Sequence, residues 1–219
     1  MNFKGAIFDM DGTLINSLIV WETVFNAIFK KFNNGNIIKF TEEELKTFCT
    51  STFDKTCEYL HTKYSFGNST KEILDTLNSS VYEFYSNEVE VKDGVIEFLD
   101  YCLANNVKMC LASATDISLM QVAVKRCGLE KYFSHIISCS EIGKGKEFPD
   151  IYLKGLELLG TEMKETYIFE DSCVSVKTAK KAGFTVVAVY EALNTGHEEI
   201  KKTADIYIDK GETLMKIAK

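Results

Sequence analysis

Short apolar runs of β-strand character alternate with helical patterns along most of the chain, and this alternation restricts the possible folds more than any other feature. The apolar runs span Gly5–Asp9, Val107–Ala112, His135–Cys139, Thr166–Phe169, Thr185–Tyr190 and Ala204–Ile208. Helical spacing of apolar residues occupies Val95–Leu103, Ile117–Cys127, Ile151–Leu159, Ser175–Ala182 and His197–Thr203. Strands that alternate with helices in this way form a parallel sheet with helices on both faces.

The segment from residue 16 to residue 88 breaks the alternation. Apolar residues between Leu18 and Phe32 repeat at helical spacing. Thr41 and Ser69 are each followed three residues later by a glutamate, the pattern of a capping box at the start of a helix. Because no convincing strand pattern interrupts these segments, we predict that this part of the chain is all helical.

These patterns predict an α/β fold with a Rossmann-like parallel-sheet core, helices on both faces and an inserted helical cap. The core domain would comprise residues 1–15 and 89–219, and the cap domain residues 16–88. An insertion after the first strand would overhang the carboxyl ends of the strands, where open α/β sheets bind ligands. The connecting segments Ile15–Leu18 and Val89–Asp93 are expected to act as hinges.

Composition excludes several classes of function. The chain has 25 basic and 32 acidic residues. The resulting net charge of −7 disfavours sequence-independent binding of nucleic acid. Arg126 is the only arginine, which excludes a site built on several guanidinium groups. No apolar stretch approaches the length of a membrane span, and the first residues carry no signal-peptide cleavage pattern.

The seven cysteines indicate a reducing compartment. They are Cys49, Cys57, Cys102, Cys110, Cys127, Cys139 and Cys173. They form no CxxC pair and have no zinc-ligand spacing with histidine, so we interpret them as small buried apolar residues. We therefore predict a cytoplasmic protein that binds neither nucleic acid nor membrane.

Two aspartates, Asp9 and Asp11, stand at the end of the first apolar run and are followed by Gly12. Both carboxylates cannot continue a strand inside a hydrophobic layer, so they emerge at its end, where Gly12 allows a sharp turn. Such a pair suits an oxygen-liganded cation, or a nucleophile with a neighbouring acid and base. A calcium loop is excluded because its twelfth position is Val20 instead of glutamate.

Three further polar segments lie near the ends of later apolar runs. Ser113-Ala114-Thr115 offers a hydroxyl and backbone N–H groups, Lys146 precedes Pro149, and Glu170-Asp171-Ser172 supplies a second acidic pair. Parallel strands end at one edge of a sheet, so two acidic pairs, a lysine and a hydroxyl would meet there. This combination is typical of a magnesium-assisted phosphoryl-transfer site.

Together these segments resemble the motifs of haloacid dehalogenase-superfamily hydrolases of the subfamily IA type, which carry an α-helical cap after the first motif. The matching residues are Asp9-Met10-Asp11-Gly12-Thr13-Leu14, Ser113, Lys146 before Pro149-Asp150, and Phe169-Glu170-Asp171-Ser172. The resemblance covers essentially the whole chain. Asn16, Glu147 and Ser175 depart from residues common in the family, but none is an expected reacting group. Lys144 is a nearby alternative cation, but the spacing to Pro149-Asp150 favours Lys146, and we interpret Lys144 as a solvated charge.

The resemblance implies a role for each motif residue. Asp9 would attack phosphorus and form an aspartyl phosphate, while Asp11 would protonate the leaving oxygen and then deprotonate the attacking water. Ser113 and Ala114 would bind the phosphoryl group. Lys146 would also bind it and would offset the negative charge of the nucleophile.

The implied cofactor is Mg²⁺. Its ligands would be the Asp9 carboxylate, the backbone carbonyl of Asp11 and the Asp171 carboxylate, with Glu170 assisting. Because Mg²⁺ keeps several waters and uses few carboxylates, this sparse set is chemically reasonable.

The predicted function is a magnesium-dependent phosphatase, acting as a monomer on a small phosphorylated metabolite. One alternative is a phosphomutase of the β-phosphoglucomutase type, although the cap contains no arginine and Lys55 is a poor substitute. A non-catalytic phosphometabolite-binding protein is a second alternative. The presence of Asp11 argues against the dehalogenase and phosphonatase branches. Thr52, Lys55 and Tyr59 are candidate specificity residues of the cap.

Overall fold

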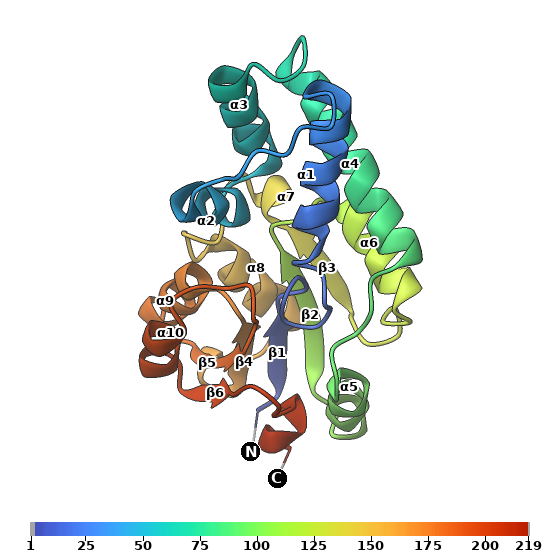
Figure 1. Cartoon of the computed structure of the whole chain (residues 1–219). Helices are drawn as coiled ribbons and strands as arrows, with labels where there is room; N and C mark the ends of the chain where they lie inside the picture. Colours follow the sequence, from blue (N-terminus) through green and yellow to red (C-terminus); the bar gives the residue numbers. More distant parts are fainter. Residues whose placement is uncertain (1–2, 219) are drawn as a thin grey trace. The chain divides into compact units, whose positions relative to one another are not determined.

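The computed structural model describes residues 3–218, with all their side chains except those of Glu42, Lys46, Cys49 and Thr50. The chain divides into two compact units (Figure 1). One unit comprises Met1–Ser17 and Val89–Lys219, and the other comprises Leu18–Glu88. Within the described residues, no helix is both long and apolar enough to cross a membrane. The assignment of these units as core and cap stays a prediction.

The first unit contains a six-stranded parallel sheet with the order β3-β2-β1-β4-β5-β6. The strands are β1 (Gly5–Phe8), β2 (Lys108–Ser113), β3 (His135–Ser138), β4 (Thr166–Glu170), β5 (Thr185–Val189) and β6 (Ile206–Ile208). Each strand lies within or beside an apolar run of the sequence, so the predicted Rossmann-like parallel sheet is confirmed.

Helices cover both faces of this sheet (Figure 1). They are α5 (Val95–Ala104), α6 (Ile117–Arg126), α7 (Cys139–Ile142), α8 (Asp150–Leu159), α9 (Cys173–Lys181) and α10 (His197–Thr203), with short 3₁₀ helices η1 (Met163–Glu165) and η2 (Leu214–Ile217). Ile7 of β1 belongs to a buried cluster with side chains of α8, α9 and α10. The next residue, Phe8, contacts Phe98 of α5 with ring centroids 6.2 Å apart. Successive strand residues face opposite sides, so α5 lies across the sheet from α8–α10.

The second unit is built from four helices: α1 (Val20–Phe32), α2 (Glu42–Thr50), α3 (Phe53–Tyr64) and α4 (Thr70–Asn87). Phe25, from the apolar stretch between Leu18 and Phe32, lies in the core of this unit with aromatic side chains from later in the chain. Phe25 contacts Phe40 and Phe48 at centroid separations of 4.7 and 5.3 Å. These side chains therefore hold α1 to α2 and to the segment between them.

The two capping patterns of this unit form differently. The Thr41 side chain accepts from the Glu44 N–H, and the Glu44 carboxylate accepts from the Thr41 N–H, so this capping box is complete. The Ser69 side chain accepts from the Glu72 N–H, but the Glu72 carboxylate accepts from the N–H of Asn68, at 3.0 Å. The second pattern therefore marks the start of a helix correctly, but its reciprocal bond shifts by one residue.

Candidate functional site

The register of the sheet brings the motif residues of three strands to one edge. Phe8, the last residue of β1, pairs with Leu111 of β2 and with Phe169 of β4. The Asp9 N–H continues the ladder by donating to the Phe169 carbonyl at 2.9 Å. Asp9, the end of β2 and the end of β4 are therefore neighbours at the carboxyl edge, as the sequence predicts.

The loop after β1 depends on Gly12. This residue has a φ of +80°, a backbone conformation that side chains disfavour. A Cβ atom at this position would also overlap the Asp171 Oδ2 atom. Glycine therefore allows the loop both to turn and to approach the acidic residues after β4.

A buried lysine joins two of the predicted carboxylates. Lys146 Nζ donates to Asp9 Oδ1 and, at 2.7 Å, to Glu170 Oε1. The hydroxyl of Tyr152, on α8, donates to the same Glu170 oxygen at 2.8 Å. The exposed fractions of the Lys146, Asp9 and Glu170 side chains are 10%, 7% and 1%. Lys144 instead pairs with Asp150 at 2.6 Å and is half-exposed, in agreement with its interpretation as a solvated charge.

Burial and charge act against each other in this cluster. Burial alone would lower the pKa of Lys146, but the carboxylates of Asp9 and Glu170 raise it well above its usual value. Burial raises the pKa of Asp9, an effect that the Lys146 ammonium opposes and the Glu170 carboxylate increases. A second cation near these carboxylates would therefore be favourable.

Asp11 is half-buried and is held by two hydroxyl groups, one from the last residue of β2 and one from the segment after it. Its Oδ2 atom accepts from Ser113 Oγ at 3.2 Å and from Thr115 Oγ1 at 2.8 Å. Ala114 lies between these residues and is exposed. The structure thus places Ser113 beside Asp11, while its contact with a phosphoryl oxygen stays a prediction.

Asp171 is buried, and both of its carboxylate oxygens accept hydrogen bonds from neutral side chains. Thr13 Oγ1 donates to Oδ1 at 3.3 Å, and Asn194 Nδ2 donates to Oδ2 at 2.5 Å. Burial, reinforced by the neighbouring Glu170 carboxylate, raises the pKa of Asp171 to about 7, against the effect of the Asn194 hydrogen bond. The side chain is therefore oriented without a direct cationic partner among these contacts.

Three of the predicted metal ligands lie together. Asp9, Glu170 and Asp171 each offer a carboxylate oxygen, and these three oxygens lie within 4.8 Å of one another. All three residues are buried, and hard oxygen ligands of this kind suit Mg²⁺. The residues present therefore fit the cofactor that the sequence predicts.

Sequence reasoning assigned no role to Thr115, Tyr152 and Asn194. Thr115 is the last residue of the predicted segment Ser113-Ala114-Thr115, so its place in that segment was a usable signal. Tyr152 lies in an apolar helical pattern that is typical of core, and Asn194 lies in a loop after β5 without any motif.

The candidate specificity residues lie in the helical unit. The Thr52 side chain accepts from the Lys55 N–H at the start of α3, and the Tyr59 hydroxyl donates to Glu44 at 3.0 Å. Both residues thus have structural contacts within their own unit. Their contribution to specificity stays a prediction.

Comparisons with known proteins show the family and the fold of this chain. The sequence model of the family described as haloacid dehalogenase-like hydrolase matches residues 6–189. A phosphorylated carbohydrates phosphatase of Thermotoga maritima is 24% identical over 99% of this chain and 98% of its own length. The pyrophosphatase PpaX of Bacillus mycoides is 22% identical over 99% and 97%. The crystal structure of CbbY from Rhodobacter sphaeroides in complex with phosphate shares the fold, with a TM-score of 0.81, 20% identity and 94% coverage of both chains.

Proposed function

Because the chain belongs to the haloacid dehalogenase-like hydrolase family, we propose that it is a magnesium-dependent phosphatase acting on a small phosphomonoester through an aspartyl-phosphate intermediate. The observation that carries this proposal is the buried cluster of Asp9, Glu170 and Asp171 with Lys146 at the carboxyl edge of the sheet. Relatives named as phosphatases support the same reaction class, that of phosphoric monoester hydrolases.

Asp9 is the nucleophile in this proposal. Lys146 binds its Oδ1 atom and so orients the carboxylate at the end of β1. One Asp9 oxygen forms a bond to phosphorus while the bond between phosphorus and the ester oxygen of the substrate breaks. Lys146 balances the negative charges of the nucleophile and the phosphoryl group, which would otherwise repel each other in a dry site.

Asp11 carries the protons of both steps. Its carboxyl group donates a proton to the leaving ester oxygen, and its carboxylate then takes a proton from the water that attacks the aspartyl phosphate. This second step breaks the bond between phosphorus and Asp9 and releases inorganic phosphate. Ser113 and Thr115 orient Asp11 through its Oδ2 atom. Ser113 and the adjoining Ala114 are proposed to bind phosphoryl oxygens.

The residues that would hold Mg²⁺ are Asp9, the backbone carbonyl of Asp11, and Asp171. Glu170 Oε1 already accepts from two donors, so Glu170 is proposed to assist rather than to bind the ion closely. When bound, the ion would supply positive charge to the phosphoryl oxygens and to the nucleophile.

The proposed setting is the cytoplasm, where the protein would act as a monomer with residues 16–88 as the cap of the active site. The six cysteines whose side chains the structure describes are free, which supports a reducing compartment; Cys49 lies outside those described side chains. Size-exclusion chromatography with light scattering tests the monomer.

The test is hydrolysis of para-nitrophenyl phosphate and of a sugar-phosphate and nucleotide panel, with Mg²⁺ and with EDTA. Asp9→Asn keeps the size of the side chain and is expected to abolish phosphate release. Asp75→Asn, on the exposed side of α4, is the matched control and should retain it. Release that persists in Asp9→Asn would remove Asp9 as nucleophile. Faster conversion of β-glucose 1-phosphate to glucose 6-phosphate than phosphate release would identify a phosphomutase instead.

A further inference from the structure

A loop that belongs to none of the four motifs reaches the acidic cluster. This loop follows β5 and carries Asn194, which is half-buried. Asn194 Nδ2 donates to two acceptors of Asp171, its side-chain Oδ2 at 2.5 Å and its backbone carbonyl at 3.1 Å. Only the nitrogen of an asparagine amide can donate, so these two oxygen acceptors fix the orientation of the amide.

We propose that Asn194 is a positioning residue for the metal site, which holds the Asp171 carboxylate in the direction that Mg²⁺ requires. The inference rests on the proposed function, because it assumes that Asp171 binds the ion. The physical reason is the neutrality of the donor. An amide occupies one lone pair of Oδ2 and leaves the negative charge of the carboxylate for the cation, whereas a lysine at this place would compete with the ion.

Thr13 forms a hydrogen bond with the second carboxylate oxygen of Asp171. Its hydroxyl donates to Oδ1 at 3.3 Å, so each carboxylate oxygen accepts one neutral hydrogen bond. Rotation of the carboxylate would break both bonds. The two donors come from the loop after β1 and the loop after β5, and Asp171 therefore depends on the relative position of these loops.

The loop that carries Asn194 is itself anchored. The Glu191 carboxylate accepts from the Leu193 N–H at 3.2 Å and from Lys92 Nζ at 2.6 Å. This ion pair is largely buried, with exposed side-chain fractions of 14% for Lys92 and 10% for Glu191. Lys92 Nζ also donates to the Tyr190 carbonyl at 3.3 Å. Glu191 and Lys92 thus anchor the beginning of the loop that carries Asn194.

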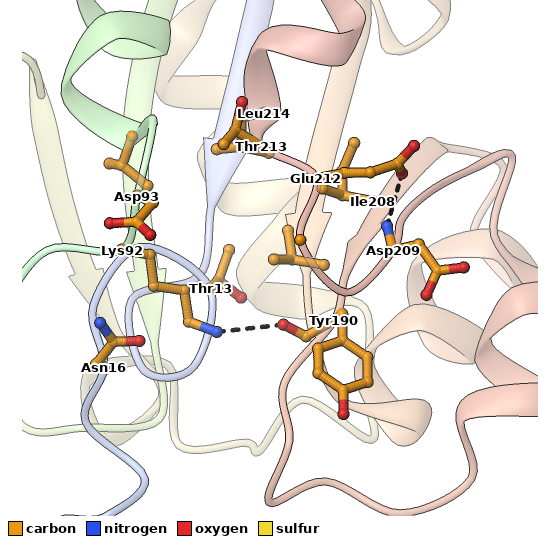
Figure 2. Close-up of a pocket in the computed structure, with 13 residues that line it drawn as sticks. Thr13, Asn16, Lys92, Asp93, Tyr190, Ile208, Asp209, Glu212, Thr213 and Leu214 are labelled. Atoms are coloured by element: carbon orange, nitrogen blue, oxygen red, sulfur yellow. Dashed lines mark hydrogen bonds between the residues drawn. The ribbon is translucent and has the colours of Figure 1, made fainter.

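Lys92 lies in the second segment that connects the two units. Its N–H donates to the Leu14 carbonyl at 2.9 Å, next to the bridge between Ile15 and Val91. Figure 2 shows Lys92 and Thr13 together on the wall of a cavity of about 220 Å³, with the Lys92 ammonium directed at Tyr190. Asn194 is therefore supported by the part of the chain that was predicted to act as a hinge.

The experiment measures Mg²⁺ binding in the absence of substrate, from the rise of the unfolding midpoint with Mg²⁺ concentration. Asn194→Ala removes the donor, and Asn194→Leu removes it while keeping a similar size. Both are expected to weaken Mg²⁺ binding by about 10- to 100-fold, as is usual when the partner of a metal ligand is lost. Thr195→Ala, an exposed change in the same loop, should bind Mg²⁺ as the wild type does.

A merely structural contact would lower the midpoint equally with and without Mg²⁺, and that result would overturn the proposal. Wild-type Mg²⁺ binding in both Asn194 variants would also overturn it. Lys92→Met tests whether Lys92 supports Asn194. As a single substitution it should weaken Mg²⁺ binding. Combined with Asn194→Ala it should cause no further loss, because Lys92 acts through Asn194. If the wild type binds Mg²⁺ but hydrolyses no phosphoester, the proposed function fails while the positioning role is still decided by the binding data.

Discussion

Replacing Glu44 with glutamine is expected to destabilise the helical unit by about 2–3 kcal/mol. Glu44 Oε1 accepts from Tyr59 at 3.0 Å, from Lys63 at 2.9 Å and from the Tyr64 hydroxyl. Its Oε2 atom accepts from the N–H and the hydroxyl of Thr41, at 2.7 and 2.9 Å. One carboxylate therefore caps α2 and joins it to α3.

The magnitude follows from the hydrogen-bonding capacity of the new side chain. Glutamine has one acceptor oxygen, which can accept hydrogen bonds either from Thr41 at the helix cap or from the tyrosine hydroxyls of α3. Its NH₂ group then faces the remaining set of donors and cannot accept from them. Loss of the cap costs about 1 kcal/mol. Loss of the charge weakens the remaining hydroxyl bonds by about 1–2 kcal/mol. The exposed neighbour Glu43 is the control, since Glu43→Gln should change stability by less than about 0.5 kcal/mol.

Trp21 provides the assay. It is the only tryptophan, and it lies in α1 beside Phe53 of α3, so its fluorescence during urea unfolding reports on the helical unit. Hydrogen bonds from Tyr64, Lys63 and Thr41 hold the pKa of Glu44 well below its usual value. A carboxyl group whose pKa is lower in the folded than in the unfolded state stabilises the fold at pH values above its unfolded-state pKa. This contribution is lost as the pH falls towards the folded-state pKa. The deficit of Glu44→Gln should therefore shrink from pH 6 to pH 3, and an equal deficit at both values would refute the reasoning.

Two further predictions concern the acidic cluster. Tyr152→Phe removes one of the two donors to Glu170 Oε1 and should lower kcat/KM about tenfold, whereas an unchanged kcat/KM would show that Lys146 alone orients Glu170. In EDTA, the contribution of Asp171 to the free energy of unfolding should fall as pH rises from 5 to 8, because its raised folded-state pKa of about 7 favours the protonated form. Urea unfolding with and without Mg²⁺ measures this, and an Mg²⁺ effect that does not grow with pH would contradict it.

The sequence predicted the sheet well because each strand is a short apolar run between polar turns. The last strand shows where prediction from apolar runs fails. It was predicted from Ala204 but begins at Ile206, since the Asp205 carboxylate binds the Val186 N–H at 2.7 Å and the Lys180 ammonium. An aspartate inside an apolar run is a local signal, but its partners lie on other elements and are visible only in the folded chain.

The candidate site also contains residues that the sequence predicts and residues that it does not. Asp9 and Lys146 belong to motifs whose spacing can be read directly, and the structure joins them. Tyr152 and Asn194 reach the same cluster from a helix and a loop that carry no motif, because tertiary packing alone decides which polar groups meet a buried carboxylate. The roles of these residues in catalysis and metal binding stay predictions.

The distribution of charge within the cluster explains why a cation is expected beside Asp171. Lys146 is shared by Asp9 and Glu170, so its single positive charge already serves two buried carboxylates. Asp171 receives its hydrogen bonds from the neutral groups of Thr13 and Asn194. These bonds orient its carboxylate but bring no charge to it. Burial and the Glu170 carboxylate raise the pKa of Asp171 by more than the Lys146 and Lys92 ammonium groups lower it, so the carboxylate is buried at a cost. A divalent ion between Asp171 and Asp9 would remove that cost, and the neutral donors would keep the position open for it.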